Sequence, residues 1–200
     1  MIGQHATRKQ SGISTVLGVL MGISLIGGMV PAIALARATI VVDSFDQSGT
    51  AKGWNGVADG KISAQVVAGA ESPVLRVEFD LKPDGWGGFV ERPLDPAIDL
   101  SDMLLLTMKA RSDTNEPPTG IGIKLIEEDG DKWEIRVDPG HGEWLLVEAW
   151  LDEFGASWDS QGDKLPFNTP VIRIELFAVK EKDGTKVPGW FEVDDIVFTD

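Results

Sequence analysis

Two adjacent aspartates stand near the end of the chain, where apolar residues should continue a β-strand. They are Asp194 and Asp195 in the stretch GWFEVDDIVFTD, from Gly189 to Asp200. Paired carboxylates can form a catalytic acid pair, bind a cation, or face solvent at the edge of a sheet. The rest of the sequence must decide between these three chemistries.

Catalysis by these carboxylates lacks an essential group. Many jelly-roll glucanases carry a Glu-x-Asp-x-x-Glu pattern along one strand, and Glu192 and Asp194 match its first two positions. The third position is Val197, so the proton donor is missing. His141 lies between two glycines and is the only histidine beyond the N-terminal region, which excludes a multi-histidine zinc site. The sequence therefore predicts no enzyme, and a glycoside hydrolase or lyase is the lesser alternative.

A cation site is the second chemistry that these carboxylates could serve. Ca²⁺ takes six to eight oxygen ligands, mostly carboxylates and carbonyls, and needs neither cysteine nor histidine. Asp43 and Asp46 open the predicted fold as Asp194 and Asp195 close it. If the first and last strands are neighbours, we expect these four acids to hold one structural Ca²⁺. The alternative is that all four are solvated residues at strand ends.

The tryptophans point to a different kind of site. The chain has seven tryptophans and no tyrosine. Trp86 and Trp158 lie among Gly, Asp, Ser and Gln, where little apolar surface can bury them. An exposed indole beside carboxylates and amides can stack on the C–H face of a sugar ring while its polar neighbours bind hydroxyls, although each could also fold over its own loop. The predicted carbohydrate-binding residues are Trp86, Trp158, Asp84, Arg92, Asp159 and Gln161.

The elements that must position these residues are strands. Short alternating runs, separated by turn residues, predict an all-β antiparallel sandwich of about ten strands. Asp-Gly pairs predict hairpins at 127–132 and 181–186, and a single helical turn is expected within 151–156. Trp133, Trp144 and Trp150 fall in strands and are expected in the core. The predicted strands are 39–45, 61–68, 74–80, 87–92, 104–111, 120–127, 132–138, 143–150, 171–179 and 190–198.

The N-terminal region differs from the rest of the chain. Residues 1–12 contain Arg8 and Lys9 but no acid, and Ile13 to Ala36 contain no charge. This pattern predicts an export signal peptide over residues 1–38, with an uncleaved membrane anchor as the alternative, and a single domain over 39–200. The protein is thus expected in the periplasm, at the cell surface or outside the cell.

Charge and cysteine content limit the partners and the chemistry. The formal net charge is −14, which would repel phosphate backbones, so the sequence predicts no nucleic-acid binding. No cysteine is present. The domain must therefore be held together by its core or by a metal ion.

Several segments in order resemble the family 11 carbohydrate-binding modules and related galactose-binding-like jelly rolls. The resemblance covers about residues 42–200 and implies a sandwich that binds β-glucan-like polysaccharides, with structural calcium and no catalysis. It also implies that Asp195, and with it Asp46, contacts the ion. Binding aromatics in this family are often tyrosines, which this chain lacks. The segments that carry the resemblance are 94–111, 121–137, 144–154, 172–179 and 190–198.

A second resemblance gives the alternative function. The closing strand is also similar to that of the complex I intermediate-associated domain, and GWGGF (85–89) lies where that family has a glycine-rich motif. This similarity implies a structural or assembly sandwich that binds a protein partner.

Overall fold

The computed structural model describes residues 38–45, 51, 53–82, 86–113, 120–178 and 188–200. These residues all belong to one compact unit, Ala36–Asp200. The predicted leader, Asp46 and Asp84 lie outside the described residues. Within the described part of the chain, no helix is long and apolar enough to cross a membrane.

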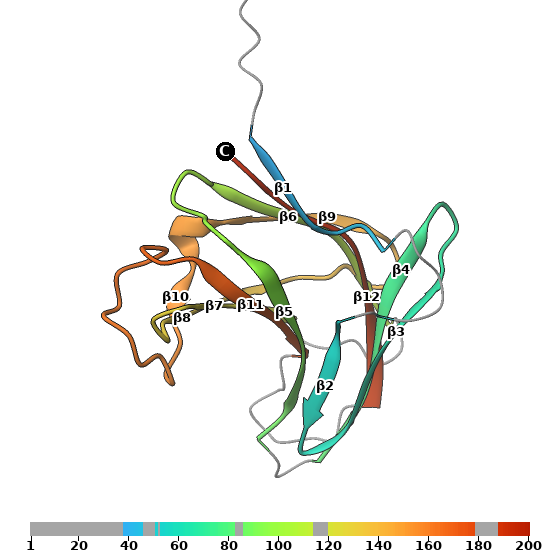
Figure 1. Ribbon diagram of the computed structural model, residues 1–200. Coiled ribbons are helices and arrows are strands. Elements are labelled where there is room, and N and C mark those ends of the chain that lie inside the picture. The colour runs from blue at the N-terminus through green and yellow to red at the C-terminus, as the bar shows by residue number, and fades with distance from the viewer. Residues whose placement is uncertain (1–37, 46–50, 52, 83–85, 114–119, 179–187) are drawn as a thin grey trace, which may run out of the picture. The chain divides into compact units, whose positions relative to one another are not determined.

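The domain consists of two antiparallel six-stranded sheets, here named sheet A and sheet B (Figure 1). A short 3₁₀ helix, Leu151–Glu153, links β9 (Leu145–Trp150) to β10 (Gly155–Ala156). Sheet A has the order β3 (Gly60–Ala68), β4 (Pro73–Leu81), β12 (Pro188–Thr199), β6 (Leu105–Ser112) and β9 (Leu145–Trp150), with β1 (Thr39–Asp43) also paired to β12. Sheet B has the order β10 (Gly155–Ala156), β8 (Lys132–Val137), β7 (Ile121–Glu127), β11 (Val171–Ala178), β5 (Gly88–Ile98) and β2 (Asn55–Ala58).

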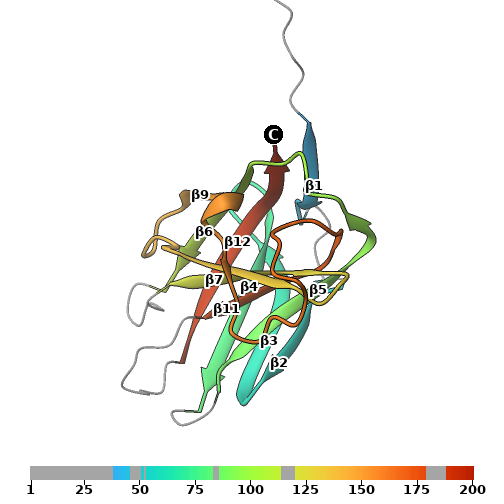
Figure 2. The ribbon, with the colours of Figure 1, turned by 90° about the vertical axis from the view of Figure 1, so that its left-hand side faces the viewer.

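The core lies between the two sheets because alternate residues of each strand point inward. In sheet B, Ile123 and Leu176 are fully buried, and in sheet A, Leu106 and Phe191 are fully buried. Figure 2 views the domain with β7 and β11 crossing the strands of sheet A. The predicted all-β sandwich is confirmed.

A β-bulge in β12 explains the paired aspartates. Asp194 pairs with Lys109 of β6 and Val197 with Thr107, so β12 carries one residue more than its partner across this step. Asp195 has a φ of 51°, a left-handed conformation that aspartate tolerates far better than β-branched residues do. As a consequence, the odd-numbered residues Phe191 and Val193 face inward before the bulge, and the even-numbered residues Ile196 and Phe198 face inward after it.

The bulge also marks the point at which β12 changes its neighbour. Its first half, Pro188 to Val193, pairs with β4, whereas its second half pairs with β1. The first and last strands are therefore neighbours, as expected from the sequence.

Three details of the predicted fold differ from the structure. The short strands β2 and β10 carry too few apolar residues to give a signal. Residues 181–186 lie outside the described residues, but the strands that flank them, β11 and β12, lie in different sheets and do not form the predicted hairpin. Trp150 is 47% exposed on the edge strand β9 and Trp144 is half-buried just before that strand, so neither is a core residue, whereas Trp133 is buried as expected.

Candidate functional site: a groove on sheet B

The outward-facing side chains of sheet B form two neighbouring rows. In one row, Glu134 of β8 lies beside Lys124 of β7, which lies beside Glu175 of β11. In the next row, Arg136 is opposite Gly122, and Gly122 is opposite Phe177. These rows form the floor of a cavity of about 480 Å³, which we call the sheet B groove.

Phe177 provides an aromatic surface in the floor of the groove. A Cβ atom at Gly122 would overlap the Phe177 ring, so the ring lies directly over this glycine of the neighbouring strand. Glycine is required at position 122 because any side chain would displace the ring. Lys124 Nζ lies 6.0 Å from the centre of the same ring.

Trp86 and Trp158, predicted separately from the sequence, line the same groove. Trp86 is 62% exposed and Trp158 is 91% exposed. The Trp86 ring lies 5.9 Å from that of Phe89, measured between centroids, so it adjoins the aromatic part of the groove. Two loops distant in the sequence thus bring exposed indoles to one surface.

The loop that carries Trp158 is fixed to sheet B on both sides of the indole. Ser157 N donates to the Lys132 carbonyl at 2.8 Å. Asp159 accepts from Lys132 Nζ at 2.6 Å and from Lys124 Nζ at 3.3 Å. Burial raises the pKa of Asp159, but hydrogen bonds from Lys132 and Ser157 and the charges of both lysines hold it far below its usual range. Asp159 is therefore a firmly ionised acceptor beside the tryptophan.

A second charged group lies on β11. Arg173 pairs with Glu91 at 3.1 Å and with Glu175 at 3.3 Å. Burial raises the pKa of Glu175, and the nearby Arg173 and Lys124 oppose this shift. The groove therefore offers hydrogen-bond donors and acceptors in alternation, as the hydroxyls of a sugar require.

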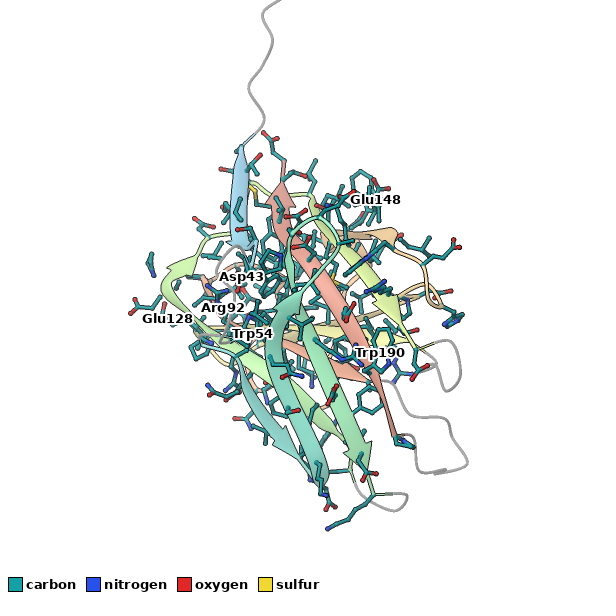
Figure 3. The ribbon with its side chains drawn as sticks, turned by 90° about the vertical axis from the view of Figure 1, so that its right-hand side faces the viewer. Asp43, Trp54, Arg92, Glu128, Glu148 and Trp190 are labelled. Carbon is teal, nitrogen blue, oxygen red and sulfur yellow. The ribbon has the colours of Figure 1, made fainter. Side chains whose placement is uncertain are left out.

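Two other predicted sugar-binding residues, Arg92 and Gln161, do not line this groove. Arg92 lies on β5, with its guanidinium paired to Asp43, and Figure 3 shows the two side chains together beside Trp54. Gln161 is exposed and its backbone N–H donates to the Gly130 carbonyl at 3.2 Å. The strand residues Lys124, Arg136, Arg173 and Phe177 were not identified from the sequence, because outward-facing charges on a strand look like any solvated face.

The predicted metal ligands have separate partners among the described residues. Asp43 accepts from Trp54 Nε1 at 3.1 Å in addition to pairing with Arg92. Asp194 accepts from Ser72 Oγ at 2.8 Å, and Asp195 pairs with Lys109 at 2.8 Å. Although β1 and β12 are neighbours, these three carboxylates do not form a cluster in the described part of the chain.

A different acidic group has the spacing that a metal ion requires. Carboxylate oxygens of Glu127, Asp129 and Asp131 lie within 4.8 Å of one another in the β7–β8 turn. All three acids already accept protein hydrogen bonds: Glu127 from Trp133 and from Thr169 N at 2.9 Å, Asp131 from Lys164 N at 2.6 Å, and Asp129 from Asp131 N at 3.0 Å. N–H donors therefore occupy oxygens that a cation would need, so the fit to a metal ion is only partial.

The candidate catalytic groups are buried or neutralised. Glu192 is 2% exposed and lies between Arg76 at 3.0 Å and Arg111 at 2.6 Å. Ser112 Oγ lies 3.1 Å from His141 Nδ1, but Ser112 is fully buried and cannot meet a substrate. Neither arrangement presents an acid or a nucleophile to solvent.

Comparison with solved structures identifies the architecture. The family 11 carbohydrate-binding module from Clostridium thermocellum, in complex with a β-1,3-1,4-mixed-linked tetrasaccharide, matches with a TM-score of 0.65 and 20% identity, over 82% of this chain and 96% of that one. The same module of cellulosomal cellulase Lic26A-Cel5E of Clostridium thermocellum matches with a TM-score of 0.64 and 19% identity, over 82% and 95% of the two chains. The described domain has the fold of a family 11 carbohydrate-binding module.

This fold also occurs as part of larger proteins. The agarase AgWH50C matches over 79% of this chain but only 25% of its own, with a TM-score of 0.58 and 14% identity. No family model matches the sequence, and no curated protein does. The likeness therefore lies in the fold.

Proposed function

We propose that this protein is an exported, non-catalytic module that binds a polysaccharide along the sheet B groove. The observation that carries the proposal is the convergence of Trp86 and Trp158 on one groove whose floor contains Phe177. Solved structures of the same fold include one with a bound mixed-linked tetrasaccharide, which supports a β-glucan-like ligand. The predicted signal peptide supports export.

Binding would combine stacking with hydrogen bonds to hydroxyls. Almost the entire surface of Trp158 is exposed to solvent. When the indole stacks on a sugar face, it replaces contact with water by apolar contact, and no packing interaction of the free protein is broken. Asp159 and Lys132, already oriented by each other, can accept from and donate to the same hydroxyls. Phe177 and Trp86 would hold the next sugars along the chain.

Affinity electrophoresis and calorimetry on mixed-linked β-glucan test the proposal. Trp158→Ala should weaken binding about tenfold or more, as expected for a central aromatic contact. The melting temperature should stay unchanged because the side chain is almost fully exposed. Trp150→Ala, at an exposed tryptophan on the other sheet, is the matched control. Wild-type protein that binds no polysaccharide would contradict the proposal.

A protein partner is the second candidate function, and the edge of sheet A favours it. Leu146 is 65% exposed, Trp150 47% and Leu104 57%, an unusual concentration of apolar side chains beside an edge strand. If this edge is an assembly surface, Trp150→Ala should abolish the association and Trp158→Ala should leave it intact. The same two variants therefore separate the two functions.

A further inference from the structure

The charge of the sheet B groove differs in sign from that of the protein. The whole chain carries a net charge of −14. The groove is lined by four cationic side chains, Lys124, Lys132, Arg136 and Arg173, but by three acids. A neutral polysaccharide gives no reason for such a local excess of positive charge.

Most of these cations are already compensated. Lys124 and Lys132 share Asp159, and Lys124 also approaches Glu134 at 3.4 Å. Arg173 is paired with acids of β5 and β11. Arg136 is exposed, and across the described ranges no hydrogen bond or ion pair engages its guanidinium. It is therefore a cation available to a ligand.

Arg136 lies at the place where it would meet a sugar stacked on Phe177. The two residues are separated only by Gly122, which has no side chain, and the Phe177 ring lies over that glycine. Neighbouring strands are about 4.8 Å apart, so the backbone of Arg136 lies about two strand spacings from the backbone of Phe177. The Arg136 side chain therefore starts beside the Phe177 ring. A sugar on the ring would thus present its outer substituent to Arg136.

We propose that the groove binds a glycan bearing an anionic group, a carboxylate or a sulfate, on the sugar that stacks on Phe177, and that Arg136 binds this group. The inference rests on the polysaccharide-binding function proposed above and specifies its ligand. The planar guanidinium matches both anions through two parallel N–H donors.

The anionic groups on this glycan are sparse. Repulsion from the acidic remainder of the protein is screened beyond about 8 Å at physiological salt, so a contact ion pair persists while a densely charged polymer is disfavoured.

The test compares each polymer with its own neutral form. Full-length protein is titrated with glucuronoxylan and with carboxyl-reduced glucuronoxylan, with a sulfated galactan and its desulfated form, and with neutral mixed-linked β-glucan. We expect at least one charged polymer to bind about tenfold more tightly than its neutral form. Preference for one of the two charged polymers supports the inference and identifies the anion.

Substitutions at Arg136 test whether this residue causes the preference for the charged polymer. Arg136→Gln should remove the preference and leave the affinity for the neutral form unchanged, whereas Arg136→Lys should retain part of it. Lys61→Gln, at an exposed residue of β3 in sheet A, changes the net charge equally and should retain all of it.

Two outcomes overturn the inference, and they are distinguishable. If neutral and charged forms bind equally, or if Arg136→Gln keeps the preference, the anionic ligand is wrong and the proposed function stands. If no polysaccharide binds at all, both fail together.

Discussion

At the residue scale, Gly122 controls the groove by having no side chain. Its Cα hydrogen faces the Phe177 ring, and a methyl group there would overlap that ring. We expect Gly122→Ala to displace Phe177 and to weaken polysaccharide binding about as much as Phe177→Ala does, roughly tenfold. Calorimetry with the best-bound polymer measures the effect.

A second glycine of sheet B provides the control for this substitution. Gly155 in β10 has no atom within 4 Å of the position that a Cβ would take. Gly155→Ala should therefore leave binding unchanged. If Gly122→Ala bound like wild type, Phe177 would not form part of the binding surface.

Asp194 gives a pH-dependent prediction at the same scale. Burial, together with the charge of Asp195, raises the pKa of Asp194, while the hydrogen bond from Ser72 opposes the shift. The folded state therefore holds this proton more tightly than the unfolded state does, and the free energy of unfolding falls as the pH rises above about 3.9. Asparagine cannot ionise and can keep both partners of Asp194, with its Oδ1 accepting from Asp195 N and its Nδ2 donating to Ser72 Oγ.

The measurement is the melting temperature of Asp194→Asn against wild type between pH 3 and pH 8. The amount by which the melting temperature of Asp194→Asn exceeds that of the wild type should be smallest at pH 3 and should grow toward neutral pH. Asp159→Asn is the opposite control, because its pKa is lowered and its contribution to stability is lost as the pH falls. A difference for Asp194→Asn that does not change with pH would contradict the assignment.

The sequence predicted loop residues of the groove better than strand residues. Trp86, Trp158 and Asp159 stood out because polar loops rarely bury an indole. Phe177 and Arg136 did not, because a strand with alternating residues gives no sign of which solvated face is used. Arg92 does not line the groove: its guanidinium pairs with Asp43, which is distant in the sequence and meets it only in the folded domain.

At the element scale, β12 shows why sequence patterns predict strands more reliably than register. Its alternation changes phase at Asp194 and Asp195, a break that the sequence leaves open to several interpretations. The structure assigns it to a bulge at which β12 exchanges β4 for β1. Ile172 in β11 is similar: simple alternation with the buried Ile174 would turn it inward, but it lies at a register shift and is 38% exposed.

The bulge leads to a prediction about Asp195. A residue with a φ of 51° must be glycine, asparagine or aspartate to avoid strain, and a β-branched side chain there costs on the order of 1–3 kcal/mol. Asp195→Asn should unfold near the wild-type denaturant midpoint, and Asp195→Val at a clearly lower one. Equal midpoints for the two variants would show that position 195 is not held in this conformation.

At the scale of the whole molecule, an acidic domain without cysteine depends on its core. Side chains of both sheets form one continuous core. A metal ion would add to this stability. The sequence predicted its ligands at the two ends of the domain, whereas the structure clusters acids in the β7–β8 turn.

Calcium binding therefore remains a prediction with two possible locations. An ion that binds only the folded state raises the free energy of unfolding by about 2.7 kcal/mol at a hundredfold excess over Kd. For a domain of this size that increase corresponds to roughly 5–10 °C in melting temperature. We expect such a rise in millimolar calcium and its loss in excess EDTA.

Two conservative substitutions distinguish the locations. Asp195→Asn keeps the backbone conformation of the bulge but removes a carboxylate predicted to bind the ion, and Asp129→Asn does the same for the exposed member of the β7–β8 cluster. If Asp195→Asn abolishes the calcium response, the ion ties the closing strand to the opening one, and Lys109 must release its partner on binding. If Asp129→Asn abolishes the calcium response, the ion fixes the β7–β8 turn beside the loop that carries Trp158. Chelation should then weaken polysaccharide binding as well as stability. Identical melting curves of the wild-type protein in calcium and in EDTA would rule out both, and the paired aspartates would serve the bulge alone.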